Sequence, residues 1–179
     1  EQGLEIAGEC GYKDRYTEVL NYNQVMELKG VLADSKRFLE YVQGYSEYAY
    51  PAAIGYLRQE GLMDDVDYAL VDSGWVGTLQ QSIKRLVRTV NPDKDVTGYY
   101  FGLYEIPADE SMDSYKGFYF EPGNHIRRKV HFSNSLFEGV FSAPEGMTHH
   151  YEEHNGRFHT VFDMKKNPNS EFIEKNTRA

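Results

Sequence analysis

The fold of this chain is decided by the stretch from Tyr68 to Gln80, which reads Tyr68-Ala69-Leu70-Val71-Asp72-Ser73-Gly74-Trp75-Val76-Gly77-Thr78-Leu79-Gln80. A short apolar run ends in an acid, passes two glycines and enters an amphipathic pattern. This order predicts a strand, a tight loop and a helix, with a carboxylate at the end of the strand and free backbone N–H groups at the helix start. Open α/β sheets bind ligands at that edge, so the loop is a candidate site.

The segments around this stretch predict a βαβ unit. Apolar residues alternate or recur at helical spacing, which predicts a strand over 66–71, a helix over 77–90 and a second strand over 96–104. A helix between two strands favours a parallel sheet with a right-handed crossover. Gly98 and Gly102 in the second strand allow close packing.

The N-terminal third of the chain has helical periodicity, which extends over residues 14–61. Within it we expect a helix over 47–60, because Pro51 suits a first helical turn and Gly61 suits a C-terminal cap. The sequence therefore predicts a helical N-terminal part before the first strand.

The C-terminal half carries weaker signals. Residues 117–120 predict a third strand at a sheet edge, and residues 131–141 predict a helix. Asn155-Gly156 lies between 148–151 and 157–162, and this dipeptide between alternating segments predicts a β-hairpin.

Together these patterns predict an α/β fold, with a small, mostly parallel sheet, a βαβ core, a helical N-terminal part and a C-terminal hairpin. We expect a single domain over residues 1–165, with residues 166–179 as a linker or the start of the next element. The chain begins at Glu1 rather than Met and ends in a charged segment, so we expect it to be part of a larger protein.

Composition excludes several classes of protein. A chain of 179 residues with 40% hydrophobic and 26% charged residues is typical of a globular domain. The net charge of −9 argues against nucleic acid or an anionic membrane as the main partner. No apolar run approaches the roughly 20 residues that span a bilayer. The single cysteine, Cys10, excludes an internal disulfide and favours a cytoplasmic setting.

The loop offers groups suited to a phosphorylated ligand. Asp72 can hold a metal ion such as Mg²⁺, a ribose hydroxyl or a proton, and Ser73 and Thr78 supply hydroxyl donors. Gly74 and Gly77 let the backbone approach a ligand beside the positive end of the helix dipole. Trp75 can stack on a sugar face. The alternative is a purely structural turn in which Asp72 is bonded to loop amides.

Other candidate groups lie further along the chain. Arg127, Arg128 and Lys129 form a dense basic cluster, and arginine forks bind phosphate or carboxylate. The first two are predicted to contact the anionic part of a ligand if the fold brings them over the loop; otherwise the cluster is a solvated surface patch. Glu138 is a possible general base.

The histidines raise the question of a metal site. All six lie between His125 and His159, and His149, His150 and His154 form a local cluster. On a helix, two of them would share a face, an arrangement suited to zinc. The hairpin signal at Asn155-Gly156 argues against a helix, so we predict exposed polar hairpin residues and no metal site.

The loop partly resembles that of phosphoribosyltransferases, whose diphosphate-binding loop also follows a strand and ends in Gly-Thr. Those enzymes usually carry two adjacent acids and a longer loop. The second acid is replaced here by Ser73, and the loop is shorter.

A second resemblance covers roughly residues 30–165. The segments 69–80, 98–103 and 141–146 resemble a bacterial family of large predicted hydrolases of the haloacid-dehalogenase type, linked to surface-polysaccharide biosynthesis. The family pattern is approximately Val-Asp-x-Gly-Trp-x-Gly-Thr/Ser-x-Gln. Haloacid-dehalogenase chemistry needs a second acid two residues after the nucleophilic Asp, and Gly74 stands at that position. The resemblance therefore implies that catalysis of that type lies outside this segment.

We therefore expect a domain of a larger polysaccharide-biosynthesis protein that binds a phosphorylated sugar or nucleotide-sugar at the Asp72–Thr78 loop. A hydrolase or transferase acting on phosphorylated sugars would fit this ligand. Two alternatives remain: a non-catalytic module that positions neighbouring domains of the parent chain, and a phosphoribosyltransferase-like enzyme.

Overall fold

The computed structural model describes residues 2–13, 17–163 and 167–177. These residues form two compact units, Glu1–Pro51 and Ala52–Ala179, and the boundary falls inside a long helix. Each unit is described by itself. The predicted single domain over residues 1–165 stays a prediction.

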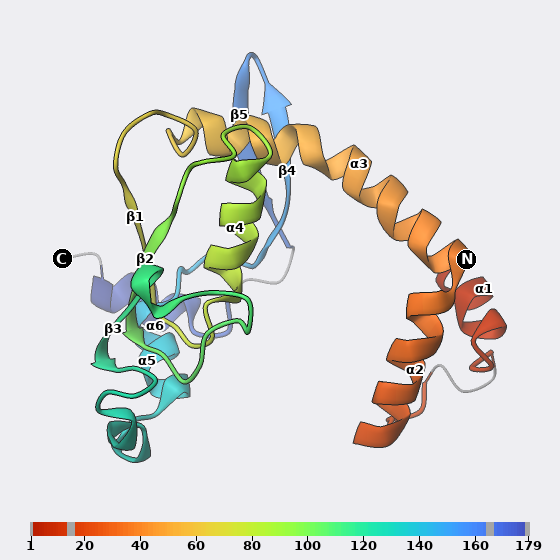
Figure 1. The fold of residues 1–179 in the computed structure, drawn as a ribbon, viewed down its shortest axis with the longest axis horizontal. Coiled ribbons are helices and arrows are strands. Elements are labelled where there is room, and N and C mark those ends of the chain that lie inside the picture. The colour runs from red at the N-terminus through yellow and green to blue at the C-terminus, as the bar shows by residue number, and fades with distance from the viewer. Residues whose placement is uncertain (1, 14–16, 164–166, 178–179) are drawn as a thin grey trace. The chain divides into compact units, whose positions relative to one another are not determined.

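The first unit is helical, as the sequence predicts. It contains α1 (Gln2–Glu9), α2 (Tyr22–Asp34) and the first part of α3 (Lys36–Gln59) (Figure 1). Helix α2 begins with a capping box, in which Asn21 and Gln24 each accept a hydrogen bond from the other's backbone N–H. The start of the predicted helical region at residues 14–16 lies outside the described residues.

The prediction of a separate helix beginning near Glu47 is wrong, because α3 starts at Lys36 and runs through Pro51. Pro51 therefore lies inside the helix, where it lacks a backbone N–H to donate but does not end the helix. The predicted end is confirmed. Gly61 adopts φ +80°, and the N–H of Leu62 donates to the carbonyl of Leu57, which closes the last turn.

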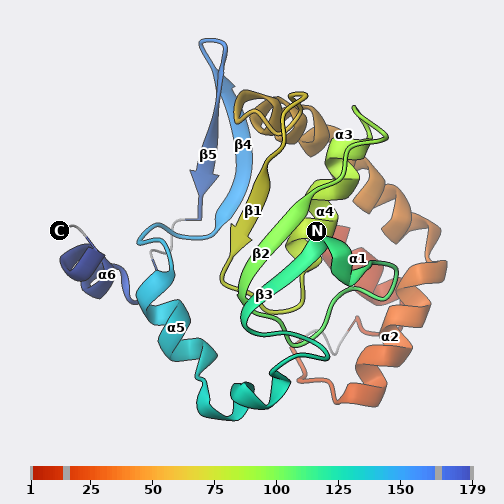
Figure 2. The same cartoon turned by 60° about the vertical axis from the view of Figure 1, so that its left-hand side comes forward.

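The second unit contains a three-stranded parallel sheet, which confirms the predicted fold class. Its strands are β1 (Ala69–Asp72), β2 (Thr97–Gly102) and β3 (Tyr115–Phe120), in the order β1-β2-β3. The helix α4 (Thr78–Arg88) connects β1 to β2 and completes the βαβ unit. Figure 2 shows the three strands face-on with α4 behind them.

Both crossovers lie on the same face of the sheet. The connection from β2 to β3 contains the short turn η1 (Met112–Ser114). Two acidic residues of this connection, which precede η1, form ion pairs with α4. Lys84 forms an ion pair with Glu110 at 2.8 Å, and Arg85 pairs with Asp109 at 2.9 Å. On the opposite face, Phe101 packs against the rings of Phe132 and Phe137, whereas Val71 is 88% exposed and Phe118 is 81% exposed.

The buried core lies between the sheet and α4. Its buried side chains include Val87 of α4 and the cluster of Tyr100, Leu103 and Tyr115. The buried Phe120 packs instead against Tyr104 and Phe132. The predicted role of the strand glycines is confirmed, since a Cβ at Gly98 would collide with the Gln80 side chain and one at Gly102 would lie 2.5 Å from the Phe120 ring.

Three further elements follow the sheet. They are the turn η2 (Ile126–His131), the helix α5 (Asn134–Phe141) and the hairpin of β4 (Thr148–His154) and β5 (Arg157–Phe162). Asn155 and Gly156 have φ of +53° and +77°, which confirms the predicted two-residue turn. The final helix α6 (Ser170–Thr177) contacts α5.

The hairpin packs against the end of α3 that belongs to the same unit. Tyr56 stacks on Tyr151 with ring centroids 4.4 Å apart, and Gln59 exchanges two hydrogen bonds with the backbone of Phe158. None of the helices in the described ranges combines the length and apolar character that crossing a membrane requires.

Candidate functional site

The predicted site begins where β1 ends at Asp72. In the parallel register Asp72 pairs with Tyr100, whose hydroxyl reaches α4, so the two side chains share the covered face of the sheet. Asp72 is half-buried, and its Oδ1 accepts a hydrogen bond from the Gly74 N–H at 3.3 Å and a long one from Ser73 at 3.5 Å. The loop therefore uses one oxygen of the carboxylate.

The two loop glycines are required by packing. Gly74 has φ +145°, and a Cβ there would lie 2.6 Å from the carbonyl oxygen of Gly102. Gly77 has φ +68°, and its Cβ would collide with the Tyr115 ring. Because backbone and ring already occupy these spaces, both glycines are explained without a ligand.

Gln80 is a structural residue at the start of α4. Its side chain is 1% exposed, and its amide donates to the carbonyls of Val96 at 2.7 Å and Ser114 at 2.9 Å. Its carbonyl oxygen accepts from the Tyr100 hydroxyl at 2.7 Å. Sequence reasoning placed Gln80 in a family pattern but did not find this role, because its partners are distant in sequence.

Helix α4 begins without a side-chain cap. Gly77 occupies the N-cap position and supplies no side-chain hydrogen bond, so the first backbone N–H groups lack that partner. Thr78 follows and is exposed, while Ser73 is half-buried. The loop between β1 and α4 thus runs from the half-buried Asp72 to the positive end of the α4 dipole.

Trp75 packs into an aromatic cluster at the carboxyl end of the sheet. Its ring lies 5.3 Å from Phe132, 5.8 Å from Phe137 and 5.9 Å from Tyr104, measured between centroids. Its indole N–H donates to Oε1 of Glu138 on α5 at 2.7 Å, and its carbonyl accepts from the Tyr104 N–H. These contacts anchor the loop to α5 and leave the indole less free to stack on a sugar.

The basic cluster lies on η2. Arg128 donates to the carbonyl of Tyr119 at 3.2 Å and lies 5.5 Å from that ring, while Arg127 is exposed. Among the described residues, neither arginine hydrogen-bonds or forms an ion pair with the loop. Lys129 lies over the Tyr104 ring, which contacts Trp75, and so connects the cluster to the loop.

Burial shifts the titration of groups between α4 and the sheet. It raises the pKa of Tyr100, with the Asp72 charge adding to the shift, and raises the pKa of Tyr115 to about 12. Burial alone would lower the pKa of Lys84, but hydrogen bonds and charges from Glu110 and Asp95 raise it overall. Tyr115 keeps a buried hydroxyl with no hydrogen-bond partner in the described residues.

The histidine cluster lies on the hairpin as predicted. His150 and His154 contact Glu152 at 2.8 and 3.1 Å, and these hydrogen bonds lower the pKa of Glu152. In the described ranges, no three histidine, cysteine, aspartate or glutamate side chains form a ready metal site.

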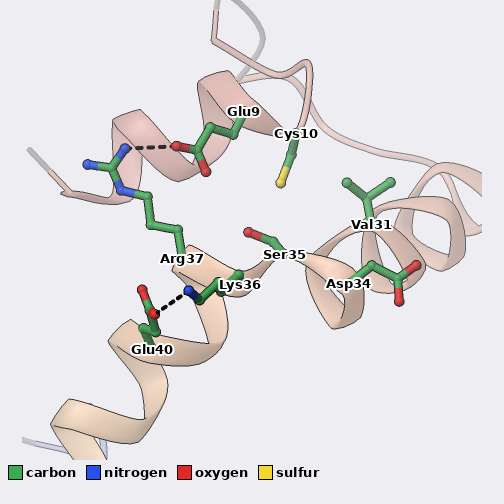
Figure 3. A pocket seen from close by; sticks show the side chains of 8 residues that line it. All are labelled: Glu9, Cys10, Val31, Asp34, Ser35, Lys36, Arg37 and Glu40. Carbon is green, nitrogen blue, oxygen red and sulfur yellow. Dashed lines mark hydrogen bonds and ion pairs between the residues drawn. The ribbon is translucent and has the colours of Figure 1, made fainter.

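Two open hollows are lined by residues other than those of the loop. One, of about 740 Å³, belongs to the helical first unit and is lined by residues of α1, α2 and α3 (Figure 3). Several of its charges form ion pairs: Arg37 bridges Glu5 and Glu9, and Lys36 lies 3.5 Å from Glu40. The other, of about 710 Å³, lies beside the segment 142–147.

A search against protein-family models finds no match for this chain, and a search of curated proteins finds none either. The resemblance to haloacid-dehalogenase-type hydrolases therefore stays a prediction from the loop pattern.

Proposed function

We propose that this chain is a ligand-binding domain of a larger bacterial polysaccharide-biosynthesis protein, and that it binds a phosphorylated sugar or nucleotide-sugar at the Asp72–Thr78 loop. The observation that carries the proposal is the half-buried Asp72 carboxylate at the end of β1, on the loop that leads into α4, whose N-cap Gly77 supplies no side-chain cap. The negative net charge fits a small-molecule ligand rather than nucleic acid. A cytoplasmic setting, where nucleotide-sugars are made, is part of the proposal.

The loop residues have distinct roles in this proposal. The first N–H groups of α4 and the Thr78 hydroxyl hold phosphate oxygens, and Asp72 holds a sugar hydroxyl or a Mg²⁺ ion. Ser73 is a second hydroxyl donor. Gly74 and Gly77 keep the loop close to the sheet, as their packing supports.

The aromatic and basic residues act around the loop. The contacts of Trp75 with Phe132, Phe137 and Glu138 support a positioning role, in which the indole fixes the loop against α5. Arg127 and Arg128 remain proposed contacts for the distal anionic part of a long ligand.

The proposal is for binding rather than complete catalysis. The position two residues after Asp72 is Gly74, whereas haloacid-dehalogenase chemistry requires an acid there. Any turnover by the parent protein would then depend on groups outside this segment.

A thermal-unfolding panel tests the proposal. Sugar phosphates, nucleotide-sugars and phosphoribosyl diphosphate are each added with and without Mg²⁺. A ligand at about 100 times its Kd should add about 2.7 kcal/mol to the free energy of unfolding. Asp72→Asn should abolish this stabilisation without lowering the melting temperature of the free protein. The matched control is Asp93→Asn, since Asp93 is exposed and follows α4.

Two results would contradict the proposal. The first is that no compound in the panel stabilises the protein; the second is that Asp72→Asn destabilises the free protein and leaves ligand binding intact. Stabilisation by phosphoribosyl diphosphate with Mg²⁺ alone would instead favour a phosphoribosyltransferase-like enzyme.

A second candidate function is supported by the exposed side chains on the face of the sheet opposite α4. Val71 and Phe118 are 88% and 81% exposed there, and Tyr99 is 53% exposed. Parallel sheets are normally covered on both faces, so this face suits a non-catalytic module that packs against neighbouring domains. Hydrogen exchange of β1 and β3 compared between this chain and the parent protein tests it. If the amides of β1 and β3 exchange equally fast in this chain and in the parent protein, the proposal of a packing module is contradicted.

A further inference from the structure

A row of aromatic rings lies on the face of the sheet opposite α4. The ring of Phe101 on β2 lies 4.3 Å from that of Phe137 on α5 and 6.1 Å from that of Phe118 on β3, measured between centroids. Phe137 in turn stacks on Phe141 at 4.4 Å. The inner rings of this aromatic row, Phe101 and Phe137, are half-buried, whereas Phe118 and Phe141 at its ends are 81% and 68% exposed.

An irregularity in β3 turns two neighbouring side chains toward this row. The register between β2 and β3 shifts after Tyr100, so Phe118 and Tyr119 both lie opposite Phe101. Their rings contact Phe101 at 6.1 and 5.5 Å. A bulge of this kind bends a strand and redirects its side chains. Phe118 and Tyr119 therefore belong to one surface, although consecutive residues of a regular strand point to opposite faces.

The basic cluster of η2 adjoins the aromatic row. Arg128 lies 5.5 Å from the Tyr119 ring and donates to the Tyr119 carbonyl, which places its charge beside the row. Arg127, Lys129 and Val130 of the same turn are exposed, Val130 by 73%. In the described ranges, no carboxylate forms an ion pair with the basic cluster, whereas the basic residues of α4 pair with acids.

The part of the chain around the row is positive, although the whole chain is negative. Residues 116–141 hold four lysines and arginines against two glutamates, in a chain with a net charge of −9. Both glutamates are engaged within the protein, since Glu121 accepts from the Gly117 N–H at 2.8 Å and Glu138 accepts from the Trp75 indole at 2.7 Å. Charges more than about 8 Å away are screened at physiological salt, so the local positive charge decides what this surface attracts.

We propose that the aromatic row and the basic cluster form a surface that docks on an anionic lipid bilayer, with the exposed rings entering the headgroup region. Cations beside projecting aromatic and aliphatic side chains are the combination that holds proteins at such a surface. Leu136 on α5, which is 72% exposed, adds a further apolar side chain. Protein interfaces are depleted in lysine, so the basic cluster favours lipid over a protein partner. This inference goes beyond the proposed function and does not rest on it.

Flotation with lipid vesicles tests the proposal on the full chain. The unaltered protein should bind vesicles of phosphatidylcholine and phosphatidylglycerol in equal parts at least about 10-fold more tightly than vesicles of phosphatidylcholine alone. At about 1 M salt the screening length falls to about 3 Å, so this preference for the anionic vesicles should disappear.

Two matched pairs of variants locate the surface. Arg127→Gln should weaken binding to the anionic vesicles by about 5-fold, the effect of one cation near a lipid surface. Its control is Arg85→Gln, on α4 and 65% exposed, which should leave binding unchanged. Phe118→Ala should weaken binding by about 10-fold. Its control is Leu79→Ala, on α4 and 59% exposed, which should have no effect.

Asp72→Asn should leave vesicle binding unchanged, which separates a failure of this proposal from a failure of the proposed function. The proposal is overturned if the chain binds neither kind of vesicle or binds both equally. Equal vesicle binding by each variant and its α4 control would overturn it as well. Binding of an acidic peptide or a single-stranded oligonucleotide, without binding to vesicles, would overturn it in favour of that partner.

Discussion

Polar residues are used in opposite ways at the start of α4 and on the outer face of the β4–β5 hairpin. At the start of α4, Gln80 is 1% exposed, and its amide group makes three hydrogen bonds within the protein. On the hairpin, His154 is 65% exposed, and its hydrogen-bond partner is the exposed carboxylate of Glu152. A buried polar group that is fully paired stabilises the fold, whereas an exposed group on a supported strand stays available to a ligand.

The residues of the loop between β1 and α4 fall into the same two groups. Gly74, Gly77 and Trp75 are in contact with the sheet or with α5 and have structural explanations. Asp72, Ser73 and Thr78 are half-buried or exposed and have hydrogen-bonding capacity left. The proposed function depends on this second group, and the following predictions test the division, from the largest effect to the smallest.

Alkaline pH should unfold the region between α4 and the sheet. Burial raises the pKa of Tyr100 and raises that of Tyr115 to about 12, whereas an unfolded tyrosine ionises near its ordinary value of 10.0. Stability is therefore complete below about pH 10 and is lost as the pH rises toward 12. Tyrosinate absorbance and circular dichroism should change together. Tyrosinate formation with a retained fold would contradict the burial of these hydroxyls.

Gln80→Ala should be the most destabilising single substitution at the start of α4. It leaves the Tyr100 hydroxyl and the carbonyls of Val96 and Ser114 without their buried partner. We expect a loss of about 3 to 5 kcal/mol in urea unfolding. The control is Gln43→Ala on an exposed part of α3, which should have little effect. A small loss for Gln80→Ala would show that this amide is not structural.

Gly77→Ala should destabilise the fold by about 2 to 3 kcal/mol. The new Cβ collides with the Tyr115 ring, and φ +68° is unfavourable for any residue with a side chain. Thermal unfolding measures the loss. Gly156→Ala is a matched control, because it has φ +77° but open space around the added carbon. If both variants lose equal stability, the collision with Tyr115 adds nothing to the destabilisation by Gly77→Ala.

Tyr100→Phe and Tyr115→Phe should change the stability of the fold by different amounts, although the two rings stack with centroids 6.1 Å apart. The first removes a hydrogen bond to Gln80 and should cost about 1 to 2 kcal/mol. The second removes a buried hydroxyl that has no partner in the described residues, and stability should stay level or rise by up to about 1 kcal/mol. Equal losses in denaturant unfolding would mean that the Tyr115 hydroxyl has a partner, such as a buried water.

His154→Ala should have the smallest effect. The melting temperature of this variant should match that of the unaltered protein, because exposed side chains away from packing contribute little to stability. A clear fall in melting temperature would show that the outer face of the hairpin helps to hold the fold.

Local patterns were sufficient to predict most elements. Apolar periodicity gave α4 and the three strands to within a few residues, and Asn155-Gly156 gave the hairpin, because these signals act over a few neighbouring positions. Pro51 misled the prediction for α3, since a proline is tolerated inside a helix when the surrounding turns are held. Only the tertiary structure could show Glu138 beside Trp75, because 63 residues separate them.

The sequence by itself determined the order of strands and helices and the placing of an acid and two glycines between β1 and α4. It did so because hydrophobic period and turn chemistry are local properties of the chain. The tertiary structure alone decided which polar side chains became enclosed and which stayed open. Whether a side chain is buried depends on what packs against it. The partners of Gln80 and Trp75 and the exposure of the hairpin histidines depend on residues far away in the sequence, so no short stretch specifies them.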